Sequence, residues 1–406
     1  MSGPFAWSKE GDPARLLKCL NAHGEARFVG GCVRDSLLGH PPGPPGATDI
    51  DVATTLHPQQ LIDILSGEGV TVIPTGVDHG TVTAVMNHVP YEITTLRSDV
   101  TTDGRRATVA FTDDWVMDAG RRDFTINALY LSLDGTIFDY HDGQADLKGG
   151  RVAFIGAPED RIKEDYLRIL RFLRFSARFS DGLDEAGWRA CVAHIEGLNT
   201  LSKERIWQEV TKLFGAARAP RVLAEAGKVQ MLDAICPSPS SPDAFEIVHG
   251  AVEGDVSPAL GLASLRPTAD RSVLAAQFKP SNAVLDAAEA LKIAGDGLAK
   301  GMPLREAVYR FGQTAARDGA LWALGQGEPS PIAADWLASA KLALTMDAPV
   351  CPYKGADLLR KGMEPGPHLG TLLTRAEEAW IKAGFPDDSA VQQAILHKVL
   401  TTAQKH

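Results

Sequence analysis

The pattern of apolar and polar positions divides the 406-residue chain into a strand-rich first third and a remainder with helical periodicity. Short β-branched runs bounded by turn residues predict strands, and these are residues 28–29, 49–53, 70–74, 81–86 and 89–96. Apolar residues at helical spacing predict helices, and these cover 13–23, 57–67, 158–179, 202–214 and the chain beyond 242. The sequence therefore predicts strands first and helices afterwards.

Four polar or proline-rich segments interrupt this pattern. Residues 40–47 are too rich in proline to be helical and predict a rigid surface loop. Residues 97–115 are polar, contain Gly104 and end near a short strand-like V-x-F run, so we expect a functional loop there. Residues 237–242 and 325–332 combine proline with serine or glycine and predict breaks between helical parts.

The composition is that of a large folded protein. A hydrophobic fraction of 44% is enough for an extensive core. The five cysteines are scattered singly, which predicts neither a disulfide framework nor a zinc site. No apolar run approaches the roughly 20 residues that a membrane helix needs, and the first residues lack the pattern of a signal peptide. We therefore expect a cytoplasmic protein without a membrane partner.

The formal net charge of −10 argues against salt-driven coating of a nucleic acid. An RNA partner would instead need a local basic surface. One cationic run stands out in this acidic chain, and it consists of Arg161, Lys163, Arg168, Arg171, Arg174 and Arg178. Taken alone, such a run is more often a solvated helix face.

A glycine pair begins the segment that we expect to bind a nucleotide. Gly30 and Gly31 follow a predicted strand end and allow a tight turn whose backbone N–H groups can face an anion. Arg34 follows as a fork-shaped donor for a phosphate oxygen. The segment therefore favours phosphate binding.

Two carboxylates follow on the next predicted strand. Alternation places Asp49 and Asp51 on one face, while Ile50 and Val52 enter the core. Two like charges this close favour a cation between them, and hard oxygen ligands with room for phosphates suit Mg²⁺. Such ions can activate an attacking hydroxyl and stabilise a leaving pyrophosphate.

The ordered string GG-x-VRD-x-LLG, followed by D-x-D-x-AT, resembles class II of the nucleotidyltransferase superfamily that shares its palm with DNA polymerase β. That class holds bacterial CCA-adding tRNA nucleotidyltransferases and poly(A) polymerases. The resemblance implies an α+β fold, an N-terminal mixed β-sheet palm followed by an all-α neck, body and tail. The implied parts are a head at 1–142, a neck at 143–230, a body at 231–330 and a tail at 331–406 that contacts tRNA.

Glu92 lies in the middle of the predicted strand 89–96. By the resemblance it is the third catalytic acid beside Asp49 and Asp51, where it would orient the primer hydroxyl. The alternative is an edge-strand glutamate in solvent.

Residues 120–130, GRRDFTINALY, resemble the second motif of the family, RRDFT-x-NA. In that motif Arg121 and Arg122 would bind phosphate or ribose oxygens. Asp123 and Asn127 would contact a ribose hydroxyl and brace the loop. An isolated surface ion pair does not explain a match of this length.

The predicted helix 158–179 contains E-D-x-x-R, which resembles the motif whose aspartate and arginine act as a template for the incoming base. Cytosine and adenine both present an amino donor beside a ring-nitrogen acceptor, whereas uracil and guanine present a carbonyl beside a ring N–H. Asp165 and Arg168 would therefore admit C and A together. Glu164 would hold Arg168, and Arg171 would add to the phosphate or RNA surface. The alternative is an intrahelical ion pair between Asp165 and Arg168.

Residues 202–214 resemble the next family motif, S-x-ER-I-x-x-E. Ser202 is expected to cap a helix whose first turn holds Glu204 and Arg205, and this helix would support the base-reading residues.

The resemblance predicts template-independent addition of CCA to the tRNA 3′ end from CTP and ATP, with Mg²⁺ as cofactor and no DNA partner. A bacterial poly(A) polymerase is one alternative, although its arginine-rich segment after the catalytic pair is missing here. Enzymes that add only CC or only A are another, and the intact segment 97–115 argues against the CC-only form. An inactive RNA-binding module is the alternative from another class, but it would be expected to lack a catalytic acid.

Overall fold

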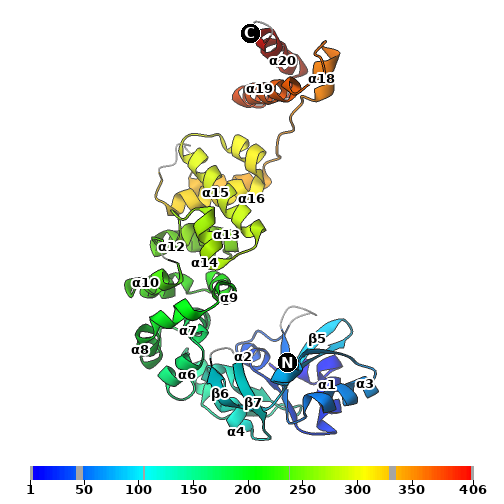
Figure 1. The fold of residues 1–406 in the computed structure, drawn as a ribbon, viewed down its shortest axis with the longest axis vertical. Coiled ribbons are helices and arrows are strands. Elements are labelled where there is room, and N and C mark those ends of the chain that lie inside the picture. The colour runs from blue at the N-terminus through cyan, green and yellow to red at the C-terminus, as the bar shows by residue number, and fades with distance from the viewer. Residues whose placement is uncertain (1–2, 43–48, 104–105, 237, 329–334, 404–406) are drawn as a thin grey trace. The chain divides into compact units, whose positions relative to one another are not determined.

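The computed structural model describes residues 3–42, 49–103, 106–236, 238–328 and 335–403 (Figure 1). The chain forms two compact units. The first comprises Met1–Pro242 with Val273–Pro280, and the second comprises Asp243–Ser272 with Ser281–His406. All strands of the described residues belong to the first unit, which confirms the α+β class with its N-terminal mixed sheet. The finer division into head, neck, body and tail stays a prediction.

Seven strands form one mixed sheet in the order β3-β4-β5-β2-β1-β8-β9. β2 runs parallel to β5, and the other neighbouring pairs are antiparallel. The strands are β1 (Ala26–Val29), β2 (Ile50–Thr54), β3 (Thr71–Gly76), β4 (Thr81–Met86), β5 (Val89–Thr95), β8 (Leu129–Leu131) and β9 (Ile137–Asp139). The first five confirm the predicted strands, whereas β8 and β9 have three residues each, too few to show a period.

A hairpin occupies the segment that we expected to be a loop. β6 (Arg97–Asp103) and β7 (Arg106–Phe111) pair as a separate antiparallel two-stranded sheet. The loop expectation was wrong because the segment, although polar, is rich in β-branched threonine and valine, which fit a pleated strand. Gly104 lies outside the described residues, as do most of the residues of the predicted loop at 40–47.

The helices of the first unit follow from their apolar stripes. In α1 (Gly11–Asn21) the buried residues include Leu16, Leu17 and Leu20, at the predicted helical spacing. The others are α2 (Gly31–Leu37), α3 (Pro58–Gly67), α4 (Trp115–Gly120), α5 (Gly143–Lys148), α6 (Pro158–Glu164), α7 (Leu167–Phe179), α8 (Glu185–Ala193), α9 (Lys203–Phe214), α10 (Ala219–Lys228), α11 (Met231–Ile235) and most of α14 (Arg271–Phe278).

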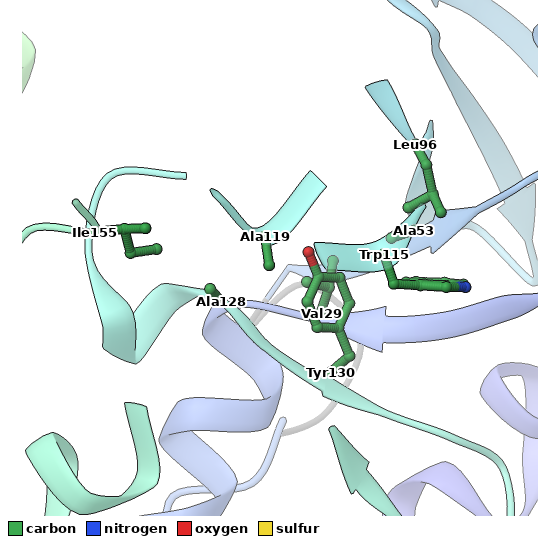
Figure 2. Close-up of a cluster of buried hydrophobic side chains, with 8 residues drawn as sticks. All are labelled: Val29, Ala53, Leu96, Trp115, Ala119, Ala128, Tyr130 and Ile155. Atoms are coloured by element: carbon green, nitrogen blue, oxygen red, sulfur yellow. The ribbon is translucent and has the colours of Figure 1, made fainter. Parts of the chain in front are cut away.

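One apolar cluster joins the sheet to α4 and so fixes the elements around the site (Figure 2). Val29 on β1 and Tyr130 on β8 are buried beside Trp115, whose ring meets that of Tyr130 edge to face at 5.3 Å. Burying one such side chain contributes about 1.5–3 kcal/mol. The cluster therefore holds the strand before Gly30 against the helix that precedes the RRD motif.

The second unit is helical, as expected for the chain beyond residue 242. Its helices are α12 (Pro242–Ala251), α13 (Pro258–Leu265), α15 (Asn282–Ala299), α16 (Leu304–Gly325), α17 (Trp336–Thr345), α18 (Gly355–Arg360), α19 (His368–Lys382) and α20 (Ser389–Ala403). In α19 the buried side chains include Leu372, Ala376 and Trp380, which follow one another at helical spacing. None of the helices in the described ranges has both the length and the apolar character that crossing a membrane requires.

Candidate active site

A cavity of about 550 Å³ in the first unit brings together most of the predicted site residues. From the β1–β2 region it is lined by Gly30, Gly31, Arg34, Asp35, Asp49 and Asp51. From the RRD motif, the break between α6 and α7, and α7 itself, it is lined by Arg122, Asp123, Asn127, Asp165, Arg168, Arg171, Arg174 and Phe175. Of the residues predicted to bind the nucleotide, Arg121 does not line it.

Parallel pairing of β2 with β5 places Glu92 opposite Asp51. β5 lies between β4 and β2, so Glu92 is not on an edge strand, but its exposure to solvent agrees with the alternative, and its catalytic role stays a prediction. Burial, together with Glu92 and Asp49, raises the pKa of Asp51 to about 6, against a smaller opposing effect of Arg122. Asp49 and Asp51 thus line the cavity, and Glu92 lies beside Asp51 on the neighbouring strand without lining the cavity itself.

Asp49 and Asp51 are the residues that would bind a divalent cation. Within the described residues, no side-chain hydrogen bond or ion pair reaches the carboxylates of Asp49, Asp51 and Glu92. In that part of the chain, no group of three or more His, Cys, Asp or Glu side chains is placed to hold a metal ion. Asp49 and Asp51 would therefore provide a partial set of oxygen ligands and leave positions for water and phosphate.

The turn before α2 has the conformation that its glycines predict. Gly30 has a φ of 73°, which favours glycine, and its N–H donates to the carbonyl of Leu129 at 3.1 Å. Arg34 is buried and donates to Asp35 at 2.8 Å and to Asn127 at 2.5 Å. Because Arg34 lines the cavity with these donors already engaged, its phosphate-binding role stays a prediction.

The carboxylate of Asp118 holds both arginines of the RRD motif. Arg121 Nε donates to its Oδ1 at 2.8 Å, and Arg122 Nη2 donates to its Oδ2 at 3.1 Å. Tyr130 also donates to Oδ2, at 2.8 Å, and Asp118 is 1% exposed. The backbone N–H of Arg97, the first residue of β6, lies 3.4 Å from Oδ1. Asp118 therefore joins the root of the hairpin to Arg122 in the cavity.

We expect Asp118→Asn to lower the free energy of unfolding at neutral pH. Burial alone would raise the pKa of Asp118, but Arg122 and Arg121 outweigh it and lower the pKa from 3.8 to about 2. Such a shift corresponds to about 2 kcal/mol of stability. Because the pKa is lower in the folded state, this stability is full above pH 3.8 and is lost as the pH falls towards 2.

Chemical denaturation of both proteins from pH 7 to pH 3 measures the effect. The difference in unfolding free energy should be largest at pH 7 and should shrink in acid. A variant as stable as the wild type at pH 7 would show that this charge contributes nothing to folding.

A second network braces the floor of the cavity. Asp123 accepts from Asn127 at 3.0 Å and from Arg171 Nε at 2.7 Å. Burial would raise the pKa of Asp123, but Arg171 and Asn127 lower it below its ordinary value. Glu209 on α9 accepts from Arg174 at 2.6 Å and pairs with Arg171 at 3.7 Å. The RRD motif is thereby fixed to α7 and α9.

The predicted helix 158–179 is broken at Asp165, so the expectation of one helix was wrong. α6 ends at Glu164, Asp165 has extended backbone angles, and α7 begins at Leu167. Asp165 Oδ1 accepts from the N–H of Leu167, the first residue of α7, at 3.0 Å, while Tyr166 occupies the N-cap position of α7. Asp165 thus lies between the two helices and lines the cavity.

Asp165 and Arg168 have separate partners, which contradicts the alternative of an ion pair between them. Asp165 Oδ2 accepts from Arg205 at 2.6 Å. Arg168 donates to Glu164, as predicted, and to the carbonyl of Arg161 at 2.7 Å. Both side chains line the cavity, each oriented by a different residue.

The supporting helix α9 differs from expectation in its cap. Ser202 occupies the N-cap position, but its side chain makes no capping hydrogen bond. Glu204 lies in the first turn and pairs with Lys279 at 2.9 Å. Arg205 on α9 donates to Asp165, whereas Glu209 on α9 pairs with Arg174 and Arg171 on α7.

The sequence did not predict a catalytic, nucleotide-binding or supporting role for five residues in or beside the cavity, which are Asp35, Asp118, Arg174, Phe175 and Glu209. Asp118 precedes Arg121 and Arg122 by three and four residues, a spacing that joins side chains on one helix face. Glu209 is the last residue of the S-x-ER-I-x-x-E match, so it had a signal too.

Comparison with known proteins agrees with this geometry. Residues 26–153 match the family described as the poly A polymerase head domain. The mitochondrial CCA tRNA nucleotidyltransferase 1 of Mus musculus is 34% identical over 388 residues, which cover 89% of this chain and 84% of the relative. The CCA-adding enzyme of Lactobacillus delbrueckii subsp. bulgaricus is 30% identical over 392 residues, which cover 92% and 94% of the two chains.

Solved structures share the fold. The CCA-adding enzyme of Bacillus stearothermophilus in complex with CTP matches with a TM-score of 0.75 at 23% identity, over 100% of both chains. The Thermotoga maritima CCA-adding enzyme complexed with tRNA matches with a TM-score of 0.70 at 17% identity, over 98% of this chain and 97% of that one. At these identities the similarity shows a common fold.

Proposed function

Because the chain belongs to the CCA-adding tRNA nucleotidyltransferase family, we propose that it adds C, C and A in turn to the 3′ end of tRNA from CTP and ATP. One observation carries the proposal for the site. Asp49 and Asp51 line the same cavity as Asp165 and Arg168, so a nucleotide held by the base-reading pair has its phosphates near the acids.

In the proposed reaction, the 3′ hydroxyl of tRNA attacks the α-phosphorus of the bound nucleotide, and pyrophosphate leaves. Asp49 and Asp51 would hold the metal, for which Mg²⁺ is the best fit, and Glu92 would orient the hydroxyl beside Asp51. When bound, Mg²⁺ supplies charge neutralisation at the reacting phosphate and lowers the pKa of the attacking hydroxyl.

The arginines of the cavity bind the triphosphate. Arg122 lines the cavity and is oriented by Asp118, which leaves its Nη1 available for a phosphate oxygen. Asp123 has both oxygens engaged by Asn127 and Arg171, so these residues brace the binding surface. Arg121 would act from outside this cavity.

Selection of C and A follows from the hydrogen-bond pattern of the base edge. Asp165 accepts from the exocyclic amino group, while Arg168 donates to the ring nitrogen. The partners Arg205 and Glu164 hold the two side chains in place before a nucleotide binds, which reduces the entropy lost on binding.

Asp165→Ala should damage discrimination against UTP and GTP as well as the rate. The variant removes the acceptor for the amino group, so CTP and ATP lose a contact that UTP and GTP never had. Measuring kcat/KM for all four nucleotides decides this, with Asp160→Ala as a control, since Asp160 is an exposed acid on α6. A uniform loss that keeps the C and A preference would refute a base-reading role.

Single-nucleotide incubations with tRNA lacking its terminal CCA separate the remaining alternatives. CTP alone should give two additions, and ATP alone should extend only a tRNA that ends in CC. A run of A residues would indicate a poly(A) polymerase, and a stop after CC with both nucleotides would indicate a CC-only enzyme. A cytoplasmic location also stays a prediction, because the mouse relative is named as mitochondrial.

A further inference from the structure

Arg161 on α6 does not line the nucleotide cavity, yet it is bonded to the motif that does. Its Nη2 donates to the main-chain carbonyls of Arg121 and Arg122, the latter at 3.1 Å. Arg122 lines the cavity near Asp51. These bonds therefore attach α6 to the part of the cavity where the triphosphate is expected to bind.

Arg161 is also bonded to the residues that are proposed to bind the base. Its Nη1 donates to Glu164 Oε1 at 2.7 Å, and the second oxygen of Glu164 accepts from Arg168. Arg168 Nη1 also donates to the carbonyl of Arg161 at 2.7 Å. The Arg161 and Arg168 side chains are only 12% and 14% exposed, so water competes little for these bonds.

This cluster spans the break between α6 and α7. Arg161 and Glu164 belong to α6, whereas Arg168 follows the extended residue Asp165 and belongs to α7. A continuous helix would fix Arg168 through its backbone, but an extended residue interrupts the helical hydrogen bonds at this point. The side-chain bonds of Arg161 and Glu164 to Arg168 therefore add to the main-chain bond between Arg168 and Asp165 in holding the two segments together.

We propose that Arg161 is a specificity-determining positioning residue that sets the place of Arg168 relative to the RRD motif. The proposal rests on the function proposed above, because it assigns Arg168 to the base and Arg122 to the phosphates. Arginine suits the role because its planar fork donates to two carbonyls and a carboxylate at once, which a lysine ammonium on a flexible stem cannot reproduce in the same geometry.

Two variants test this, Arg161→Lys and Arg161→Ala, with Asp160→Ala as the matched control. Asp160 is an exposed charged residue on the same helix, so the control removes a charge without touching the cluster. We expect both Arg161 variants to lose about tenfold or more in kcat for CTP and ATP, because small displacements of a positioning group are costly. KM should change less, since Arg161 does not touch the nucleotide.

Selectivity separates positioning from a purely structural role. Loss of folded protein lowers the rates with all four nucleotides equally, whereas a displaced Arg168 narrows the preference for CTP and ATP over UTP and GTP. Glu164→Gln combined with Arg161→Lys should be no worse than about the poorer single variant, because both act through Arg168.

An unchanged preference in Arg161→Lys, or fully additive effects in the double variant, would overturn the proposal. The lysine variant keeps the positive charge at this position, so it still tests the proposal if the alanine variant does not fold. A wild-type protein that adds no nucleotide to tRNA would instead refute the proposed function, so the two failures are distinguishable.

Discussion

Asp51→Asn should lose several kcal/mol of transition-state stabilisation, about a thousandfold or more in kcat, while the protein stays folded. The amide keeps the shape of the side chain but is a poor ligand for a hard divalent cation. Asp51 lies on β2 opposite Glu92, at the end of the cavity that also holds Asp49. No other described carboxylate is placed on β2 to substitute for it.

Stability separates this effect from misfolding. Burial, Glu92 and Asp49 raise the pKa of Asp51 to about 6, so its ionisation costs stability in the metal-free protein as the pH rises from 3.8 through 6. The neutral variant should therefore be at least as stable as the metal-free wild type at pH 7. Activity within tenfold of wild type in a folded Asp51→Asn would remove the metal-binding role.

Replacing residues 102–108 with a short Gly/Ser linker should leave both CMP additions largely intact and lower AMP addition by about a hundredfold or more. One rigid pocket cannot favour a pyrimidine and then a larger purine, so some element must change its shape. The β6–β7 hairpin is the candidate, because its first residue, Arg97, contacts Asp118, which in turn holds Arg122 in the cavity.

CMP addition by the same variant is the internal control. The replacement spares Arg97–Ser98 and the ladder partner Phe111, so the attachment of the hairpin to the rest of the unit is kept. Full CCA synthesis by this variant would show that the hairpin is only a connection and does not select the nucleotide. Equal loss of all three additions, with a lowered Tm, would instead locate the damage in the palm sheet.

Local pattern predicted the elements that carry the three acids proposed to be catalytic. Alternation around Asp49 and Asp51 predicted β2, and the strand run around Glu92 predicted β5. The parallel pairing that places Asp51 opposite Glu92 joins residues far apart in the chain, and no local period encodes it.

The errors have physical causes as well. Helical periodicity continues across Asp165 without a glycine or proline, so the break between α6 and α7 left no sign in the sequence. The polarity of residues 97–115 predicted a loop, but the β-branched threonines and valines of the same segment favour the two strands of the hairpin. The partners of Arg161, which are main-chain carbonyls, have no sequence signature at all.

The intact mass of a tRNA product tests the central claim most directly. Purified protein is incubated with Mg²⁺, all four nucleotides and a tRNA that lacks its terminal CCA, and the mass of the extended RNA is measured. The account predicts a single product that has gained two CMP and one AMP and then stops. A product that contains U or G, a run of A, or no added nucleotide would contradict it.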